Sequence, residues 1–284
     1  MFSRRWIINY VLIVLIVILT YVGNRYGVTT GYQPQQRIST LKPADIQTIG
    51  IQTADASLSL RRDAQGWLIE APIRWPANNI NIERLLSIVN SETDSRLPAD
   101  EINLATLGLQ FPEAALTFND TQLLFGATNN IGERRYVMIG STVFLLPDIH
   151  LLFFSQGLTG IADRRLLPRR YRLSKLKLSE FEISRDANDS WQVINADGFG
   201  QDQIARLVEN WQDLEASKIK PFDTDAMPRQ KLQASGADGS RHEFFVMSIA
   251  PEIVIAHPQI GLQYHFPADL YYQLISLRTD ETPG

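Results

Sequence analysis

Apolar and polar residues alternate along much of the chain in short segments, each about the length of one β-strand. In the first half of the chain, seven such segments predict strands, at residues 46–52, 56–62, 66–72, 114–118, 122–126, 135–140 and 142–147. Short polar stretches separate the first three segments, so we expect them to form an antiparallel meander.

A different periodicity follows the third predicted strand. Ile82, Leu85, Leu86 and Val89 recur at helical spacing and form one apolar stripe, which predicts an amphipathic helix. Asparagine residues precede the stripe and are suitable N-caps. A second, shorter apolar run at 148–154 predicts a closing helix with Asp148 as its cap.

The same series of elements then recurs. Strands are predicted at 172–178, 180–185, 190–196, 230–236, 241–249, 252–258 and 262–267, with helices at 200–216 and 268–277. Trp67 and Trp191 lie at matching places in the two series. The pattern predicts an α+β fold of two tandem repeats, residues 45–168 and 169–284, each an antiparallel sheet with helices packed on one face.

The N-terminal segment has no such alternation. Residues 6–22 carry no charge and are dominated by Ile, Leu and Val, which predicts a transmembrane helix within an anchor at 1–27. Arg4 and Arg5 precede this run, so we expect the N-terminus in the cytoplasm and the body outside it. Residues 28–44 are polar and predict a tether.

Two alternatives to a retained inner-membrane anchor remain at this point. A cleaved signal peptide would need small residues before the cut, and the sequence around residues 19–24 has no A-x-A-like site. A core helix would rarely lack any polar face.

Composition and charge narrow the possible functions. The 284 residues contain no cysteine, which excludes disulfides, thiolate metal sites and cysteine nucleophiles. The formal net charge is −4, and the part after residue 27 is more acidic still, because the preceding residues contain only basic charges. An acidic body argues against nucleic acid as a partner.

Several segments together resemble a known family. They are 66–72, 107–112, 123–126, 135–148 and 161–168. In this order and spacing they resemble a bacterial family of unknown function whose members are membrane-anchored, exported and internally duplicated. The resemblance implies that some members are encoded beside auxiliary components of gliding-motility-type ABC transporters. It implies no catalytic residues.

Motifs for catalysis or phosphate binding are absent from the sequence. It has no P-loop, no G-x-G-x-x-G, no G-x-S-x-G and no H-E-x-x-H. His257 and His265 are the best candidate pair for a metal, and the alternative is two partly exposed strand histidines. We favour the alternative and expect no metal, no cofactor and no enzymatic activity.

One cluster of basic residues is conspicuous on this acidic body. It consists of Arg164, Arg165, Arg169, Arg170, Arg172, Lys175 and Lys177. Either it is a docking patch for an acidic partner or anionic lipid, or it connects the two repeats by pairing with their carboxylates. Trp75 has no counterpart in the second repeat, so we expect it on the surface as part of the same candidate interaction patch.

These observations favour a membrane-anchored scaffold or accessory protein in the bacterial envelope. The family resemblance suggests an ABC-type transporter complex as the partner. The alternative is a ligand-binding protein that holds a glycan, peptide or lipid in a cleft between the repeats.

Overall fold

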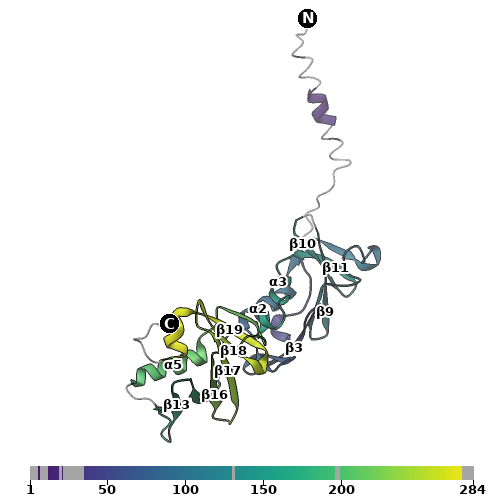
Figure 1. Ribbon diagram of the computed structural model, residues 1–284. Coiled ribbons are helices and arrows are strands. Elements are labelled where there is room, and N and C mark those ends of the chain that lie inside the picture. Colours follow the sequence, from purple (N-terminus) through teal and green to yellow (C-terminus); the bar gives the residue numbers. More distant parts are fainter. Residues whose placement is uncertain are drawn as a thin grey trace.

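The described chain forms two lobes, each built around one large antiparallel sheet (Figure 1). The computed structural model describes residues 6, 12–18, 21, 35–129, 132–195 and 199–276. We call the part of the chain up to residue 160 the first lobe and the part from residue 170 onward the second lobe. The residues between them form a connector, 161–169.

The sheet of the first lobe has nine strands. Their spatial order is β5 (Trp75–Pro76), β4 (Gly66–Ala71), β3 (Ser57–Asp63), β2 (Thr48–Thr53), β8 (Ala114–Phe118), β9 (Thr121–Asn129), β10 (Arg134–Ile139), β11 (Thr142–Pro147) and β7 (Arg96–Pro98). A two-stranded ribbon pairs β1 (Gln36–Arg37) with β6 (Glu92–Thr93). The helical segments are η1 (Pro43–Asp45), α2 (Asn79–Ser87), η2 (Ile88–Asn90), η3 (Ala99–Glu101), α3 (Leu151–Phe154) and α4 (Leu158–Ile161), where η denotes a 3-10 helix.

The sheet of the second lobe has eight strands. Their spatial order is β14 (Trp191–Ile194), β13 (Glu182–Arg185), β12 (Leu173–Lys177), β16 (Gln230–Gly236), β17 (Arg241–Ser248), β18 (Glu252–His257), β19 (Leu262–Pro267) and β15 (Lys218–Pro221). Its helical segments are α5 (Gln201–Asp213), η4 (Pro258–Ile260), η5 (Ala268–Leu270) and α6 (Tyr271–Leu274).

The chain follows the same path in both lobes. A three-stranded meander (β2–β4 or β12–β14) is followed by a helix, α2 or α5. The chain then crosses to the far edge of the sheet, where it forms β7 or β15. It then returns to the middle of the sheet, beside β2 or β12, and a four-stranded meander (β8–β11 or β16–β19) runs from there back to the edge strand. Among the described residues, only β5 has no counterpart in the second sheet.

The two predicted apolar stripes are confirmed as core. In α2 and the turn that follows it, Ile82, Leu85 and Val89 are completely buried. Asn78 caps α2 by accepting a hydrogen bond from the backbone N–H of Asn81 at 3.2 Å. In α5 the indole of Trp211 packs edge-on against Phe244 of the second sheet, with ring centroids 5.2 Å apart. Each main helix therefore buries its stripe against the sheet of its own lobe.

The expected fold class, α+β with an N-terminal transmembrane helix, is wrong. The described chain is mostly β-sheet, and α5, the longest of its labelled helices, has 13 residues. No helix of the described part combines the length and apolar character needed to cross a membrane. Most of the expected anchor, and the tether up to residue 34, lie outside the described residues.

One local expectation also needs correction, and the two matching tryptophans differ in burial. Asp148 does not cap α3, because its carboxylate binds Arg135 and the hydroxyl of Thr128 instead. Trp67 is buried as a core residue, whereas Trp191 at the matching place is only half-buried. The Arg185 guanidinium lies 4.8 Å from the centroid of the Trp191 ring. The ring of this edge-strand tryptophan is thus covered by a long side chain rather than by a second layer of secondary structure.

Gly126 in β9 has no room for a side chain. A Cβ at this position would lie 2.3 Å from the carbonyl oxygen of Leu107 and against the side chain of Leu109. We expect Gly126→Ala to reduce the free energy of unfolding by about 1–3 kcal/mol, because the 107–109 loop must move away. Urea unfolding measures this loss. Gly50→Ala is the control, because its Cβ would meet Thr117 at an ordinary 3.4 Å. Equal stability of the two variants would contradict the assignment of close packing at Gly126.

Candidate functional site at the junction of the two lobes

The connector forms backbone hydrogen bonds to both lobes. On the side of the first lobe, Asn78 N–H donates to the carbonyl of Ile161 at 2.8 Å, and Asp163 N–H donates to the carbonyl of Pro76 at 2.9 Å. On the side of the second lobe, Ala216 N–H donates to the carbonyl of Arg164 at 2.9 Å. The connector is therefore part of the structured contact between the lobes, which we call the junction.

A buried carboxylate lies at the centre of the connector. Asp163 is only 2% exposed, and its Oδ2 accepts from Arg165 Nη1 at 3.3 Å and from Arg169 Nε at 3.2 Å. Arg165 also reaches Glu215 of the second lobe at 3.2 Å, and Arg164 reaches the same carboxylate at 3.0 Å. A buried charge is costly unless it is paired, so Asp163 requires these arginines.

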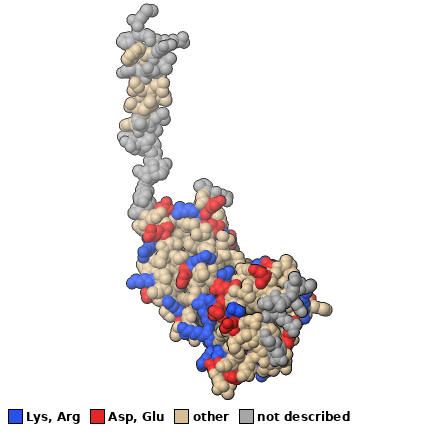
Figure 2. Space-filling view, turned by 90° about the vertical axis from the view of Figure 1, so that its left-hand side faces the viewer, with Lys and Arg blue, Asp and Glu red and all other residues tan. Residues whose placement is uncertain are grey.

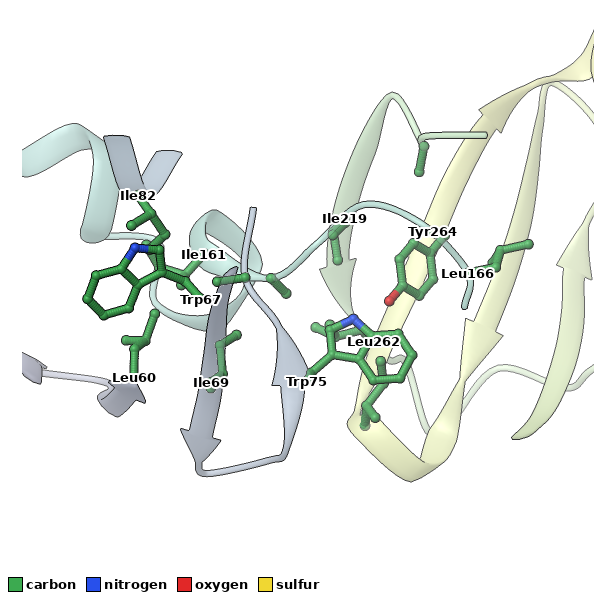
Figure 3. Packing of buried hydrophobic residues seen from close by; sticks show 14 of the residues in the cluster. Leu60, Trp67, Ile69, Trp75, Ile82, Ile161, Leu166, Ile219, Leu262 and Tyr264 are labelled. Atoms are coloured by element: carbon green, nitrogen blue, oxygen red, sulfur yellow. The ribbon is translucent and has the colours of Figure 1, made fainter. Parts of the chain in front are cut away.

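Trp75 is a buried apolar contact between the lobes. It lies on β5, is 2% exposed, and packs beside Leu262 and Tyr264 of the second sheet (Figure 3). Its ring centroid is 5.3 Å from that of His257 and 5.9 Å from that of His242. The expectation that Trp75 is a surface residue is therefore wrong, because the second lobe covers it.

A pair of buried histidines faces Trp75. His242 Nδ1 and His257 Nε2 are 3.1 Å apart and share one hydrogen bond. His257 is completely buried, and this burial, with a smaller effect from His242, lowers its pKa to about 3. Burial also lowers the pKa of His242. Both imidazoles are therefore neutral at pH 7.

Four buried polar atoms of the junction have no hydrogen-bond partner in the described structure. They are Trp75 Nε1, the Tyr264 hydroxyl, His257 Nδ1 and, in the connector, Arg164 Nε. The indole nitrogen is turned toward the Tyr264 hydroxyl (Figure 3), but the pair does not reach hydrogen-bond geometry. Burial, with a contribution from the charge of Asp163, raises the pKa of Tyr264. This polar cluster is unusual for a contact between sheets, because buried polar groups are normally paired.

Two clefts involve residues of both lobes. The larger has a volume of about 530 Å³ and lies between the 55–58 turn, the 155–159 segment, and Pro221 and Gly261 of the second lobe. The smaller, of about 330 Å³, is lined by Arg74, Trp75, Arg169 and His242 among others. The smaller cleft has the greater density of charged and hydrogen-bonding side chains.

The basic cluster of the sequence divides into two groups. Arg164, Arg165 and Arg169 pair with Asp163 and Glu215, as the connector interpretation expects. Lys175 pairs with Glu182 at 2.6 Å. The side chains of Arg170, Arg172 and Lys177 are exposed and form no hydrogen bond or ion pair within the described residues. Basic and acidic atoms lie together along the boundary between the lobes (Figure 2).

The candidate metal-binding histidines, His257 and His265, do not bond to each other. His257 and His265 are on neighbouring strands, but His257 bonds to His242, whereas His265 bonds to Glu252 at 3.0 Å. Both are buried, so the alternative of partly exposed histidines is also wrong. In the described ranges, no group of three or more His, Cys, Asp or Glu side chains is arranged to hold a metal ion.

The sequence interpretation missed the partners that Trp75 meets. The sequence predicts His242 and Tyr264 only as strand residues, and nothing in the local pattern links them to residue 75. The internal repeat was also uninformative here, because β5 has no counterpart in the second lobe. The short stretch around Trp75 lacks the alternation that identifies longer strands.

A comparison with family models matches residues 67–239, more than half of the chain, to "Domain of unknown function (DUF4340)". The chain belongs to this family. The part matched to DUF4340 begins in β4, continues through Trp75 and the connector, and ends just before β17. It therefore includes the connection between the lobes rather than a single lobe. No curated protein and no solved structure matches the chain.

Replacing Trp75 tests its role in joining the lobes. We expect Trp75→Ala to reduce the free energy of unfolding by about 3–5 kcal/mol, because it leaves a cavity between the two sheets. Urea unfolding measures this loss. Trp191→Ala removes an equally large but half-buried ring and serves as the control, with a clearly smaller loss. If both variants lose the same stability, Trp75 is not a principal contact.

The buried histidines predict a loss of stability in acid. Below about pH 6.5 the unfolded chain binds a proton at His257, whereas the folded chain does so only near pH 3. The contribution of neutral His257 to the free energy of unfolding should therefore have its full value above pH 6.5. It should fall, as the pH is lowered toward 3, by up to about 1.4 kcal/mol per pH unit from this residue. His257→Phe should give a shallower pH dependence, with the remaining slope due in part to His242. An unchanged slope between pH 6.5 and pH 4 would refute this assignment.

Proposed function

We propose that this protein is a non-enzymatic accessory protein of the bacterial envelope that binds a protein partner through exposed apolar residues on both lobes. The observation that carries the proposal is a pair of exposed residues, Phe111 and Met227. They are 84% and 90% exposed, the highest values among the large hydrophobic residues of the described chain.

Phe111 and Met227 occupy equivalent positions in the two lobes. Each is followed by a proline and lies three residues before the strand that returns to the middle of the sheet, β8 or β16. The backbone is also held in the same way. Glu113 N–H donates to the carbonyl of Phe125, and Arg229 N–H donates to the carbonyl of Val246, both at 2.8 Å.

This repeated arrangement supports binding rather than chance exposure. A single exposed apolar side chain is ordinary on a protein surface and needs no explanation. Here two exposed apolar side chains occupy equivalent positions, and each precedes a proline and a strand whose start is fixed by a hydrogen bond. They are therefore preorganised to insert into a partner. Phenylalanine and methionine are both enriched at the centres of protein interfaces. The shared strand order also supports the inference that the two lobes are copies of one module.

The nature of the partner rests on the family resemblance. It suggests an envelope location and a component of an ABC-type transporter complex. A second candidate function, ligand binding between the lobes, is supported by the two clefts at the junction.

Chemical crosslinking in cells that express the protein, followed by purification, tests the proposal. We expect a partner protein to be purified with the wild type in a fixed molar ratio. The double variant Phe111→Ser/Met227→Ser should lose that partner while keeping the wild-type stability, because neither side chain is packed in the core. Leu152→Ser is the matched control, since Leu152 is 67% exposed but lies on α3. Recovery of the same partner with the double variant would contradict the proposal.

A further inference from the structure

We propose that the smaller cleft at the junction binds an oxyanion, meaning the carboxylate or phosphate group of a small ligand. The residues that would contact the anion are Arg74, Arg169 and His242. The inference does not depend on the partner-binding proposal, because Phe111 and Met227 do not line this cleft.

Arg74 and Arg169 bring two guanidinium groups to the cleft from different parts of the chain. Arg74 is exposed and has no hydrogen-bond or ion-pair partner in the described structure. Arg169 uses its Nε to bind the buried Asp163, which leaves its two terminal nitrogens without a described partner. Asp163 therefore fixes the direction of Arg169 while part of the guanidinium remains available. Guanidinium groups match the oxygens of carboxylates and phosphates in pairs.

The surroundings of the two arginines favour a negative ligand. The one acidic side chain that lines the cleft, Asp63, accepts the backbone N–H of Gln65 at 2.7 Å within its own turn. Asn79, the first residue of α2, also lines the cleft, so the positive end of this helix contributes potential of the same sign.

His242 supplies a neutral donor. The positions of the ring hydrogens follow from His257 Nδ1, which is buried without a partner. A buried N–H without an acceptor is rare, so we assign Nδ1 of His257 as the bare nitrogen and its Nε2–H as the donor to His242 Nδ1. Neutral His242 then carries its hydrogen on Nε2, the ring nitrogen that is not engaged with His257. The histidine pair thus leaves a hydrogen-bond donor on His242, a residue that lines the cleft.

These groups suit one oxyanion rather than a large ligand. The cleft holds about 330 Å³ and presents two positive charges and one neutral donor from the two lobes and the connector. An anion bound there would contact both lobes at once. Charge-assisted hydrogen bonds to arginine are among the stronger polar contacts in proteins.

Nuclear magnetic resonance of the whole chain tests the site. Sodium acetate and inorganic phosphate are titrated separately at constant ionic strength, with sodium chloride as the reference. The signals to follow are the His242 ring and the Trp75 indole. We expect a saturable shift with acetate, phosphate or both, and which of them binds identifies the ligand as a carboxylate or a phosphate.

Arg74→Gln provides the decisive variant, because Arg74 is exposed and unpaired and its loss should leave the fold intact. We expect binding to weaken by about tenfold or more. Arg206→Gln, at an exposed arginine of α5 away from this cleft, should bind as the wild type does. Shifts that match those in chloride, or that are unchanged in Arg74→Gln, would overturn the proposal. Loss of the partner protein in the crosslinking experiment would not affect this result.

Discussion

The structure depends on the burial of Trp75 between two sheets that share no strand pairing. A tryptophan side chain buries about 150–250 Å² on folding, which corresponds to roughly 4–6 kcal/mol of hydrophobic stabilisation. Trp75 comes from the edge strand of one lobe and is covered by residues of the other. Beside it the carboxylate of Asp163 is buried and paired with arginines of the connector. The apolar contact and the ion pairs constrain the same region, so the two lobes are expected to behave as one body.

This constraint connects the fold to both proposals. A fixed arrangement of the lobes holds Phe111 and Met227 at a constant separation, which lowers the entropic cost of binding a partner at both points. The same arrangement brings Arg74 of the first lobe, Arg169 of the connector and His242 of the second lobe to one cleft. If the lobes moved independently, neither surface would exist in a defined form.

Much of the local structure could be predicted from the sequence, because periodicity is a local property. The alternation at 114–118 gives β8 with its observed bounds, and the stripes of α2 and α5 are buried as expected. Edge strands β5, β7 and β15 could not be predicted, because two to four residues show no periodicity. The fold class was wrong because the predicted closing helices are only short turns of helix, and because no helix of the described residues is long and apolar enough to cross a membrane.

The contacts at the junction could not be predicted from the sequence pattern. Trp75 meets residues that are far away along the chain, and a repeat that lacks a counterpart of β5 gives no sign of this contact. The basic cluster was recognised, but only the structure shows that Arg169 pairs with Asp163 while Arg170 remains exposed. Charge alone does not reveal which arginine has a carboxylate within reach.

Native-state hydrogen exchange measures the coupling of the lobes most directly. The amides of Asp163 and Ala216 form the hydrogen bonds that join the connector to the first and to the second lobe, and those of β9 and β17 lie within the two sheets. If the lobes form one cooperative unit, the junction amides should exchange with the same free energy of opening as the slowest amides of both sheets. Exchange of Asp163 and Ala216 at a much lower free energy, with both sheets still protected, would show that the lobes separate freely and would contradict this account.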